Sequence, residues 1–260
     1  MAAAGRVRGR AGEFARAWGL ARSLLIYHGR PWHRRRLRAL YREFLGPGDL
    51  AFDVGAHVGD RTRCFAQLGA RVIAIEPQPD LAAWLRWQFK GEPRVAVVES
   101  ALGAAPGRAT LLVSRRTPTV TTLSERWVES VQRTAGFARV AWQDRHEVPL
   151  ATLDSLIARH GLPRFCKIDV EGFEAEVLQG LSQPLPALSL EYVPAAIGIA
   201  LAAVGQLAQL GRYRFNITQG ERLRWLWPEW RRRGEVEDWL AGRTPGELSG
   251  DVYARLEAAG

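Results

Sequence analysis

The chain has 260 residues, of which 47% are apolar and 24% are charged. This composition excludes a disordered chain, and the length suits one α/β domain with appendages better than two domains joined by a linker. The formal net charge is +9, and 11 arginines before position 43 face one acidic residue, Glu13.

Residues 1–45 are predicted to form a basic helical extension. Leu24, Leu25, Leu37, Leu40, Tyr41 and Phe44 give it a partial apolar stripe. Its arginines suit a solvated face, but contact with an acidic substrate, a membrane phosphate or nucleic acid is an open alternative. Nucleic acid is not favoured as a partner.

No segment has the pattern of a secretory signal or a bilayer span. Residues 19–27 are interrupted by charge, and the uncharged residues 193–210 suit a helix packed on a sheet. We therefore expect a cytoplasmic protein, with peripheral membrane contact through the basic extension as an alternative. Cys64 and Cys166 indicate neither a disulfide framework nor a zinc site.

Short β-branched runs alternate with helical stretches over residues 46–260, which are predicted to form one domain. Helices are expected to begin near Gly59, Pro79, Leu153, Gly172 and Ala195. Strands are predicted at 50–54, 71–76, 94–99, 164–169, 187–192 and 212–218. This order predicts an α/β fold, with a mainly parallel sheet and helices on both faces.

Two regions depart from this alternation. Residues 100–145 are predicted to be an insertion with an extra strand at 108–113 and an irregular or helical part at 117–136, and such insertions often cover an active site. The C-terminal segment 220–260 is rich in Trp and Arg. Its residues 222–233 are predicted to be a closing strand with a buried aromatic face, before a final polar segment. A basic aromatic platform for a sugar, a base or a membrane is the alternative.

A glycine turn follows the first predicted strand. Asp53, Gly55 and Gly59 lie in Phe52-Asp-Val-Gly-Ala-His-Val-Gly59, and Glu76 ends the second strand 17 positions later. Ligands of open parallel sheets bind beyond the carboxyl ends of the strands, where glycines admit close backbone contact and a carboxylate accepts ribose hydroxyls. The pattern therefore predicts an adenosyl cofactor.

The turn also indicates which adenosyl cofactor is bound. The Gly-x-Gly-x-x-Gly fingerprint of nicotinamide cofactors is absent. Asp53 suits a cofactor with an ammonium group, so S-adenosylmethionine is predicted. Ala56 and His57 belong to the same turn, and Glu99 and Ala101, at the end of the third strand, are expected to border the adenine ring.

Charged residues end two later strands. Lys167, Asp169 and Glu171 alternate at the end of the strand at 164–169, and Glu191 ends the strand at 187–192. We expect these four residues to form the catalytic site. The three carboxylates suit either a general base set or a divalent-metal site, and a metal-free base is preferred.

Six blocks within residues 50–195 resemble the FkbM family of S-adenosylmethionine-dependent methyltransferases. The blocks are Phe52-Asp-Val-Gly-Ala-His-Val-Gly59, Val72-Ile-Ala-Ile-Glu-Pro77, Glu99-Ser-Ala-Leu-Gly103, Val148-Pro-Leu-Ala-Thr-Leu-Asp-Ser-Leu156, Lys167-Ile-Asp-Val-Glu-Gly-Phe-Glu174 and Leu188-Ser-Leu-Glu191. At position 57 a histidine replaces the asparagine common in that family.

The resemblance implies the class I methyltransferase (Rossmann-like) fold, a seven-stranded, mainly parallel sheet whose last strand is antiparallel. It also implies methyl transfer to oxygen, with a sugar, glycan or natural-product hydroxyl as the acceptor. Two other functions are kept as alternatives. One is a nucleotide-dependent oxidoreductase on a related sheet, and the other is a membrane- or nucleic-acid-binding module that uses the Arg-rich N-terminus.

Overall fold

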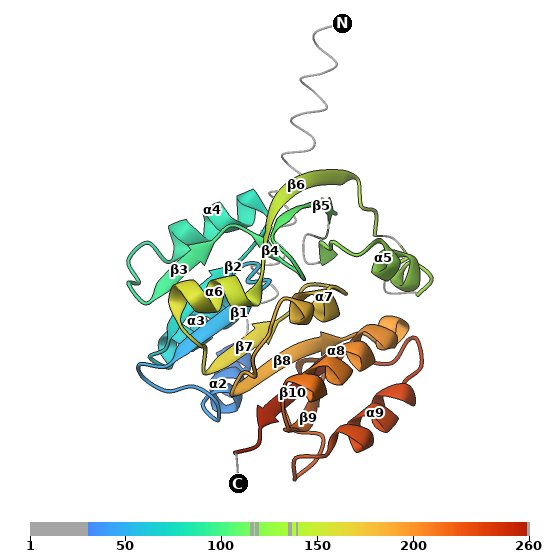
Figure 1. The fold of residues 1–260 in the computed structure, drawn as a ribbon. Coiled ribbons are helices and arrows are strands. Elements are labelled where there is room, and N and C mark those ends of the chain that lie inside the picture. The colour runs from blue at the N-terminus through green and yellow to red at the C-terminus, as the bar shows by residue number, and fades with distance from the viewer. Residues whose placement is uncertain (1–30, 115–116, 118–119, 135–136, 139, 259–260) are drawn as a thin grey trace, which may run out of the picture.

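A computed structural model describes residues 31–114, 117, 120–134, 137–138 and 140–258 (Figure 1). The predicted apolar positions Leu24 and Leu25, and the arginines before residue 31, lie outside the described residues. Within the described part of the chain, no helix has both the length and the apolar character needed to cross a bilayer.

Seven strands form the central sheet in the order β3-β2-β1-β7-β8-β10-β9. They are β1 (Leu50–Val54), β2 (Arg71–Ile75), β3 (Val95–Val98), β7 (Phe165–Ile168), β8 (Ala187–Tyr192), β9 (Tyr213–Gln219) and β10 (Gly250–Leu256). The pairs among the first five strands are parallel, whereas β10 is antiparallel to both of its neighbours. The class I methyltransferase arrangement, with its last strand antiparallel, is therefore confirmed.

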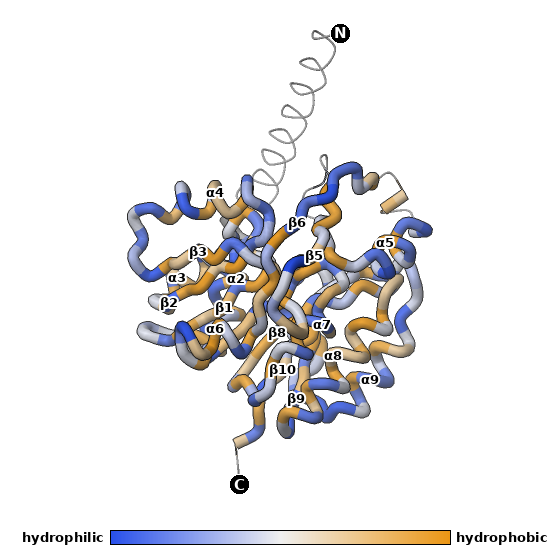
Figure 2. The backbone as a smooth tube through the Cα atoms, turned by 45° about the horizontal axis from the view of Figure 1, so that its top comes forward, coloured by the Kyte–Doolittle hydropathy of each residue, from blue (hydrophilic) through white to orange (hydrophobic). Residues whose placement is uncertain are grey.

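Helices cover both faces of the sheet (Figure 1). One face carries α6 (Leu153–His160), α7 (Glu174–Gln179), α8 (Ile197–Leu210) and α9 (Arg233–Ala241), and the other carries α2 (Pro31–Tyr41), α3 (Asp60–Gln67) and α4 (Pro79–Gln88). Side chains alternate along β1. Phe52 and Val54 pack in the core beneath α6, α7, α8 and α9, and Ala51 packs in the core on the opposite face. Figure 2 shows the resulting apolar centre and the hydrophilic outer loops.

Helix α2 packs with α3 in the core on this second face of the sheet. Leu37, Leu40 and Tyr41 are buried there, together with Phe44 just after the helix. Tyr41 packs edge-on against Phe65, with ring centroids 4.8 Å apart. The described part of the predicted apolar stripe therefore packs on the sheet layer.

Three strands from the segment between β3 and α6 form a second, smaller sheet beside the main one (Figure 1). Its strands are β4 (Ala101–Leu102), β5 (Gly107–Val113) and β6 (Asp144–Ala151), in the order β4-β6-β5, and α5 (Glu125–Val131) lies between β5 and β6 in the chain. The extra strand predicted at 108–113 is confirmed. The partner strand β6 was not predicted, because its exposed and buried residues mix charged and apolar types.

The prediction of a closing strand at 222–233 is wrong. These residues form only two isolated bridges, Phe215 with Arg231 and Thr218 with Trp225. The closing strand is β10, in the segment predicted to be polar. Proline cannot donate a ladder hydrogen bond, and Pro228 interrupts the Trp-Arg alternation.

The aromatic side chains of this segment also pack in two directions. Trp225 and Trp230 join the core around Phe44, whereas Trp227 packs edge-on against Trp239 of α9. A regular strand presents alternate side chains to one face only. The segment is therefore an irregular cover over two hydrophobic clusters.

Candidate active site

A cavity of about 210 Å³ lies at the carboxyl ends of β1, β2, β7 and β8, with residues of the smaller sheet on its far side. Nine of the residues predicted to form the site line this cavity. They are Asp53, Gly55, Ala56, His57, Glu76, Ala101, Asp169, Glu171 and Glu191. The fold therefore brings most of the predicted site residues together at one edge of the sheet.

The turn after β1 requires glycine at position 55. Gly55 has φ of 80°, in the left-handed region, and a Cβ atom there would lie 1.8 Å from the carbonyl oxygen of Asp169. The amides of Gly55 and Ala56 both donate to the carbonyl oxygen of Ile75, at 2.9 and 3.0 Å. The turn is therefore held between β2 and the end of β7.

Glu76 follows β2 and closes the turn from the side. Its side chain is 3% exposed, and its two oxygens accept the backbone amides of His57 at 2.8 Å and Gln78 at 2.9 Å. Burial raises the pKa of Glu76 to about 7, although these two hydrogen bonds favour the ionised form. Burial also lowers the pKa of His57 to about 4, so this histidine is neutral at pH 7.

Asp53 lies deeper, on β1 itself. Its carboxylate accepts the hydroxyl of Thr62 at 2.5 Å and is 2% exposed. Burial raises the pKa of Asp53 to about 6, while the hydrogen bond from Thr62 and the charge of Lys167 act in the opposite direction. Asp53 therefore supplies a carboxylate at the cavity floor that links β1 to α3.

Gly59, Glu99 and Lys167 do not line the cavity. Gly59 has φ of 82°, and a Cβ atom there would meet the side chains of Leu85 and Phe89 within 2.8 Å, so this glycine serves the packing of α3 against α4. Glu99 instead pairs with Arg86 of α4 at 2.8 Å.

Of the two residues predicted to border the adenine ring, Ala101 lines the cavity and Glu99 does not, while Ser100, which was not predicted, lines it as well. The hydroxyl of Ser100 donates to the carbonyl oxygens of Ala101 and Pro149, at 2.8 and 3.0 Å. This contact connects the end of β3 to the smaller sheet. Ser100 was missed because the third strand was expected to run to residue 99, whereas β3 ends at Val98.

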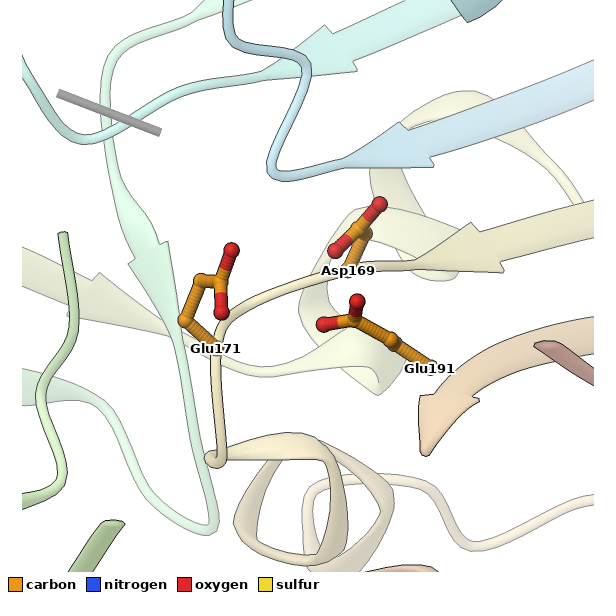
Figure 3. Close-up of side chains that lie close together, drawn as sticks. All are labelled: Asp169, Glu171 and Glu191. Carbon is orange, nitrogen blue, oxygen red and sulfur yellow. The ribbon is translucent and has the colours of Figure 1, made fainter. Parts of the chain in front are cut away.

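Asp169, Glu171 and Glu191 form an acidic cluster (Figure 3). Asp169 and Glu171 follow β7 and Glu191 lies on β8, and the figure shows their carboxylates directed toward a common space. One oxygen of each lies within 4.8 Å of the others. The cluster can therefore share protons or hold a hard cation.

The loop after β7 has the strained conformation that aims Glu171 into the cluster. Glu171 has φ of 53°, which is uncommon for a residue other than glycine. Its carbonyl oxygen accepts the hydroxyl of Thr122 at 2.6 Å. A Cβ atom on the next residue, Gly172, would lie 2.2 Å from the Trp127 ring, so glycine is required there.

The pKa values within the acidic cluster are shifted in opposite directions. Burial and the charge of Asp169 raise the pKa of Glu171 well above its ordinary value, and burial and the charge of Glu171 do the same for Glu191. Burial would also raise the pKa of Asp169, but the charge of Lys167 and its hydrogen bond lower it overall. Asp169 therefore loses its proton more readily than the two glutamates beside it.

Lys167 lies beneath the acidic cluster, 1% exposed. Its ammonium donates to Asp169 at 3.1 Å and to Asp251 of β10 at 2.8 Å. Burial opposes its charge, but the two carboxylates raise the pKa of Lys167 well above its ordinary value. Lys167 is a buried counter-charge for the cluster, and Asp251, which also lines the cavity, was missed from the sequence.

Comparison with known proteins gives a family match. Residues 53–194 match the family model described as Methyltransferase FkbM domain. This match sets aside the nucleotide-dependent oxidoreductase that the sequence left as an alternative. No curated protein matches the sequence.

The solved structures to which the chain is similar include two methyltransferases. Precorrin-6y C5,15-methyltransferase from Geobacter metallireducens GS-15 is 14% identical with a TM-score of 0.47, over 86% of this chain and 86% of that chain. An O-methyltransferase from Bacillus cereus in complex with SAH is 13% identical with a TM-score of 0.48, over 92% of this chain and 90% of that chain.

Proposed function

We propose, because the chain belongs to the FkbM family of S-adenosylmethionine-dependent methyltransferases, that it methylates a hydroxyl oxygen of a sugar, glycan or natural-product acceptor. The observation that carries this proposal is the acidic cluster. Three carboxylates meet within 4.8 Å at the same sheet edge as the glycine turn, so a proton acceptor would lie beside a bound methyl donor.

The cofactor would occupy the part of the cavity around β1 and β2. Gly55 lets the donor approach the backbone closely, and Glu76 would accept hydrogen bonds from the ribose hydroxyls. The adenine ring would lie against Ser100 and Ala101, at the end of β3. This arrangement directs the amino acid part of the cofactor toward Asp53 and the acidic cluster.

The reaction is an in-line displacement. The acceptor oxygen forms a bond to the methyl carbon while the carbon–sulfur bond breaks, and its electron pair stays on sulfur as S-adenosylhomocysteine leaves. The hydroxyl proton passes to a carboxylate. Holding the acceptor at the correct distance and angle supplies a large part of the rate enhancement, and the carboxylate contributes a further factor.

Glu171 and Glu191 are the proposed proton acceptors. A carboxylate with a raised pKa is a stronger base when ionised than an ordinary one, and the pKa values of both residues are raised. Asp169, held ionised by Lys167, would orient the acceptor hydroxyl or the cofactor ammonium. The same three carboxylates would also suit a divalent cation, which is the second candidate for charge balance in this site.

Methyl transfer can be tested with labelled S-adenosylmethionine and a panel of monosaccharide, glycan and natural-product acceptors. We expect a labelled product that resists mild alkali, because a methyl ether is stable there and a methyl ester is not. Transfer of the label to an ester or to nitrogen would contradict the proposal.

Variants then test the proton acceptors. Glu171→Gln and Glu191→Gln should each lower kcat by about 100-fold or more, while binding of S-adenosylhomocysteine is retained. Glu129→Gln, at an exposed position of α5, is the matched control and should leave kcat unchanged. Unchanged turnover by both cluster variants would remove the base assignment.

A further inference from the structure

The cavity is strongly acidic, with one basic exception. Among the described residues that line it, Arg61 is the single Lys or Arg side chain. The acidic side chains of the lining are Asp53, Asp60, Glu76, Asp169, Glu171, Glu191 and Asp251. An arginine in such a surrounding requires a reason, because a uniformly acidic wall would be sufficient to attract a cationic methyl donor.

Arg61 is the second residue of α3, directly after the glycine turn. Its side chain is 18% exposed, and Nη1 donates to the carboxylate of Asp60 at 2.9 Å. Its charge also acts on carboxylates on both sides of the turn. It opposes the burial that raises the pKa of Asp53, and with Lys167 it opposes the burial of Asp169.

The methyl donor has a part that needs such a cation. Its amino acid tail carries an ammonium, which suits the carboxylates of Asp53 and Asp169, and a carboxylate, which these groups would repel. A buried carboxylate requires a charged or hydrogen-bonding partner. The guanidinium fork matches a carboxylate geometrically, and its five N–H donors allow a second carboxylate beside Asp60.

The position of Arg61 adds the field of a helix terminus. Helix α3 has eight residues and begins at Asp60, so its first backbone amides face the turn side. The positive end of a helix favours an anionic group close to it. The helix and the guanidinium therefore act in the same direction, toward an anion between the turn and α3.

We propose that Arg61 binds the carboxylate of the methionine part of S-adenosylmethionine, an inference that rests on the proposed function of this cavity. Arg61 is then a specificity residue that distinguishes donors with an intact amino acid tail from other adenosyl compounds. If Arg61 serves only to pair with Asp60 at the start of α3, its removal affects all adenosyl ligands equally.

Isothermal titration calorimetry with two ligands separates these roles. S-adenosylmethionine and decarboxylated S-adenosylmethionine share the adenosine, the sulfonium and the ammonium, and differ in the carboxylate alone. Arg61→Gln should weaken binding of the first roughly 10- to 100-fold, as expected for loss of a charge-assisted pair. Binding of the decarboxylated ligand should be unchanged or tighter, because a repulsive positive charge is removed.

Arg63→Gln is the matched control on the same helix. The guanidinium of Arg63 lies 5.8 Å from the centre of the Phe89 ring and does not line the cavity, so this variant should bind both ligands as the wild type does. Arg61→Lys keeps the charge but loses the fork. It should bind S-adenosylmethionine with an affinity between those of the wild type and Arg61→Gln, and it decides the matter if the Gln variant does not fold.

The outcomes distinguish this inference from the proposed function. Equal weakening of both ligands by Arg61→Gln, or wild-type affinity for S-adenosylmethionine in both Arg61 variants, overturns the inference and leaves the cofactor site standing. A folded wild-type protein that binds neither ligand overturns the proposed cofactor site, and the role of Arg61 with it.

Discussion

Replacement of Lys167 by methionine tests whether this lysine stabilises the site as the counter-charge of Asp169 and Asp251. Lys167 is 1% exposed and pairs with Asp169 and Asp251, at 3.1 and 2.8 Å. Methionine has a similar length and no charge, so the variant keeps most of the packing and leaves two carboxylates without their counter-charge. We expect the acidic cluster to gain protons and the fold to lose stability.

The size of the expected loss of stability follows from the burial of Lys167, Asp169 and Asp251. Removal of one member of a buried ion pair destabilises a protein by about 3–5 kcal/mol. The side chain of Asp169 is 38% exposed, and water can therefore screen part of its charge. We accordingly expect the lower end, about 3 kcal/mol, which corresponds to a decrease in Tm of roughly 6 °C for a chain of this length.

The difference in stability between the wild type and Lys167→Met should depend on pH. The pKa of Asp169 is lowered in the folded state from its ordinary value of 3.8. Its pairing with Lys167 therefore stabilises the protein fully at pH values above 3.8, and this contribution is lost as the pH falls through the folded pKa. The pKa of Lys167 is raised, so its own contribution is present below 10.5. The difference between wild type and variant should therefore be largest near neutrality and decrease below about pH 4.

Urea unfolding followed by tryptophan fluorescence measures this difference. Lys90→Met is the matched control, since Lys90 is the other lysine of the chain and is exposed, and it should change the free energy of unfolding by less than about 0.5 kcal/mol. Adding Asp251→Asn to Lys167→Met should restore part of the stability, because it removes one orphaned carboxylate. Equal stability of Lys167→Met and Lys90→Met, or no restoration by Asp251→Asn, would contradict the role of Lys167 as a stabilising counter-charge.

Four further predictions concern the cavity itself. Gly55→Ala should unfold the site and abolish cofactor binding, because the new methyl group would meet the carbonyl oxygen of Asp169 at 1.8 Å, whereas Gly91→Ala, with open space around it, should bind normally in calorimetry. The affinity for S-adenosylhomocysteine should fall as the pH decreases through about 7, because protonated Glu76 accepts fewer hydrogen bonds, and a Glu76→Gln variant should bind weakly at every pH. Glu76 should also lower the free energy of unfolding as the pH rises from 4.5 to about 7, because the folded carboxyl keeps a proton that the unfolded chain has released, and a pH series against Glu76→Gln measures this. Dialysis against a chelator should leave methyl transfer unchanged if the acidic cluster is a metal-free base, and loss of turnover that Mg²⁺ restores would assign a cation to it instead.

The parts of the fold and site that the sequence predicts are those specified by local patterns. A buried strand, a glycine turn and the start of a helix stand within residues 50–67, so the position of Gly55 follows from neighbours in the chain. Glu76 ends the adjacent strand, and the parallel order brings both to the same edge. Asp169 and Glu191 reach that edge by the same rule, which explains why the acidic cluster was predicted without a structure.

The residues that sequence reasoning misplaced depend on contacts between distant segments. Glu99 continues a strand pattern, yet its side chain pairs with Arg86 of α4 and does not line the cavity. Asp251 stands in a segment of mixed polarity, and only the antiparallel insertion of β10 between β8 and β9 places it opposite Glu191 and within 2.8 Å of Lys167. A pattern of side-chain types along one strand carries no information about such pairing.

The environment of Lys167 depends both on the local sequence pattern and on contacts between distant segments. Alternation correctly placed it on the same side of β7 as Asp169, and three charges at a strand end indicated an active site. The sheet order adds a carboxylate from β10 on the other side of its ammonium, which buries Lys167 completely and removes it from the cavity surface. We therefore expect the lysine to act on the reaction through the ionisation of Asp169, and a Lys167 variant should alter the pH profile of kcat even where substrate binding is retained.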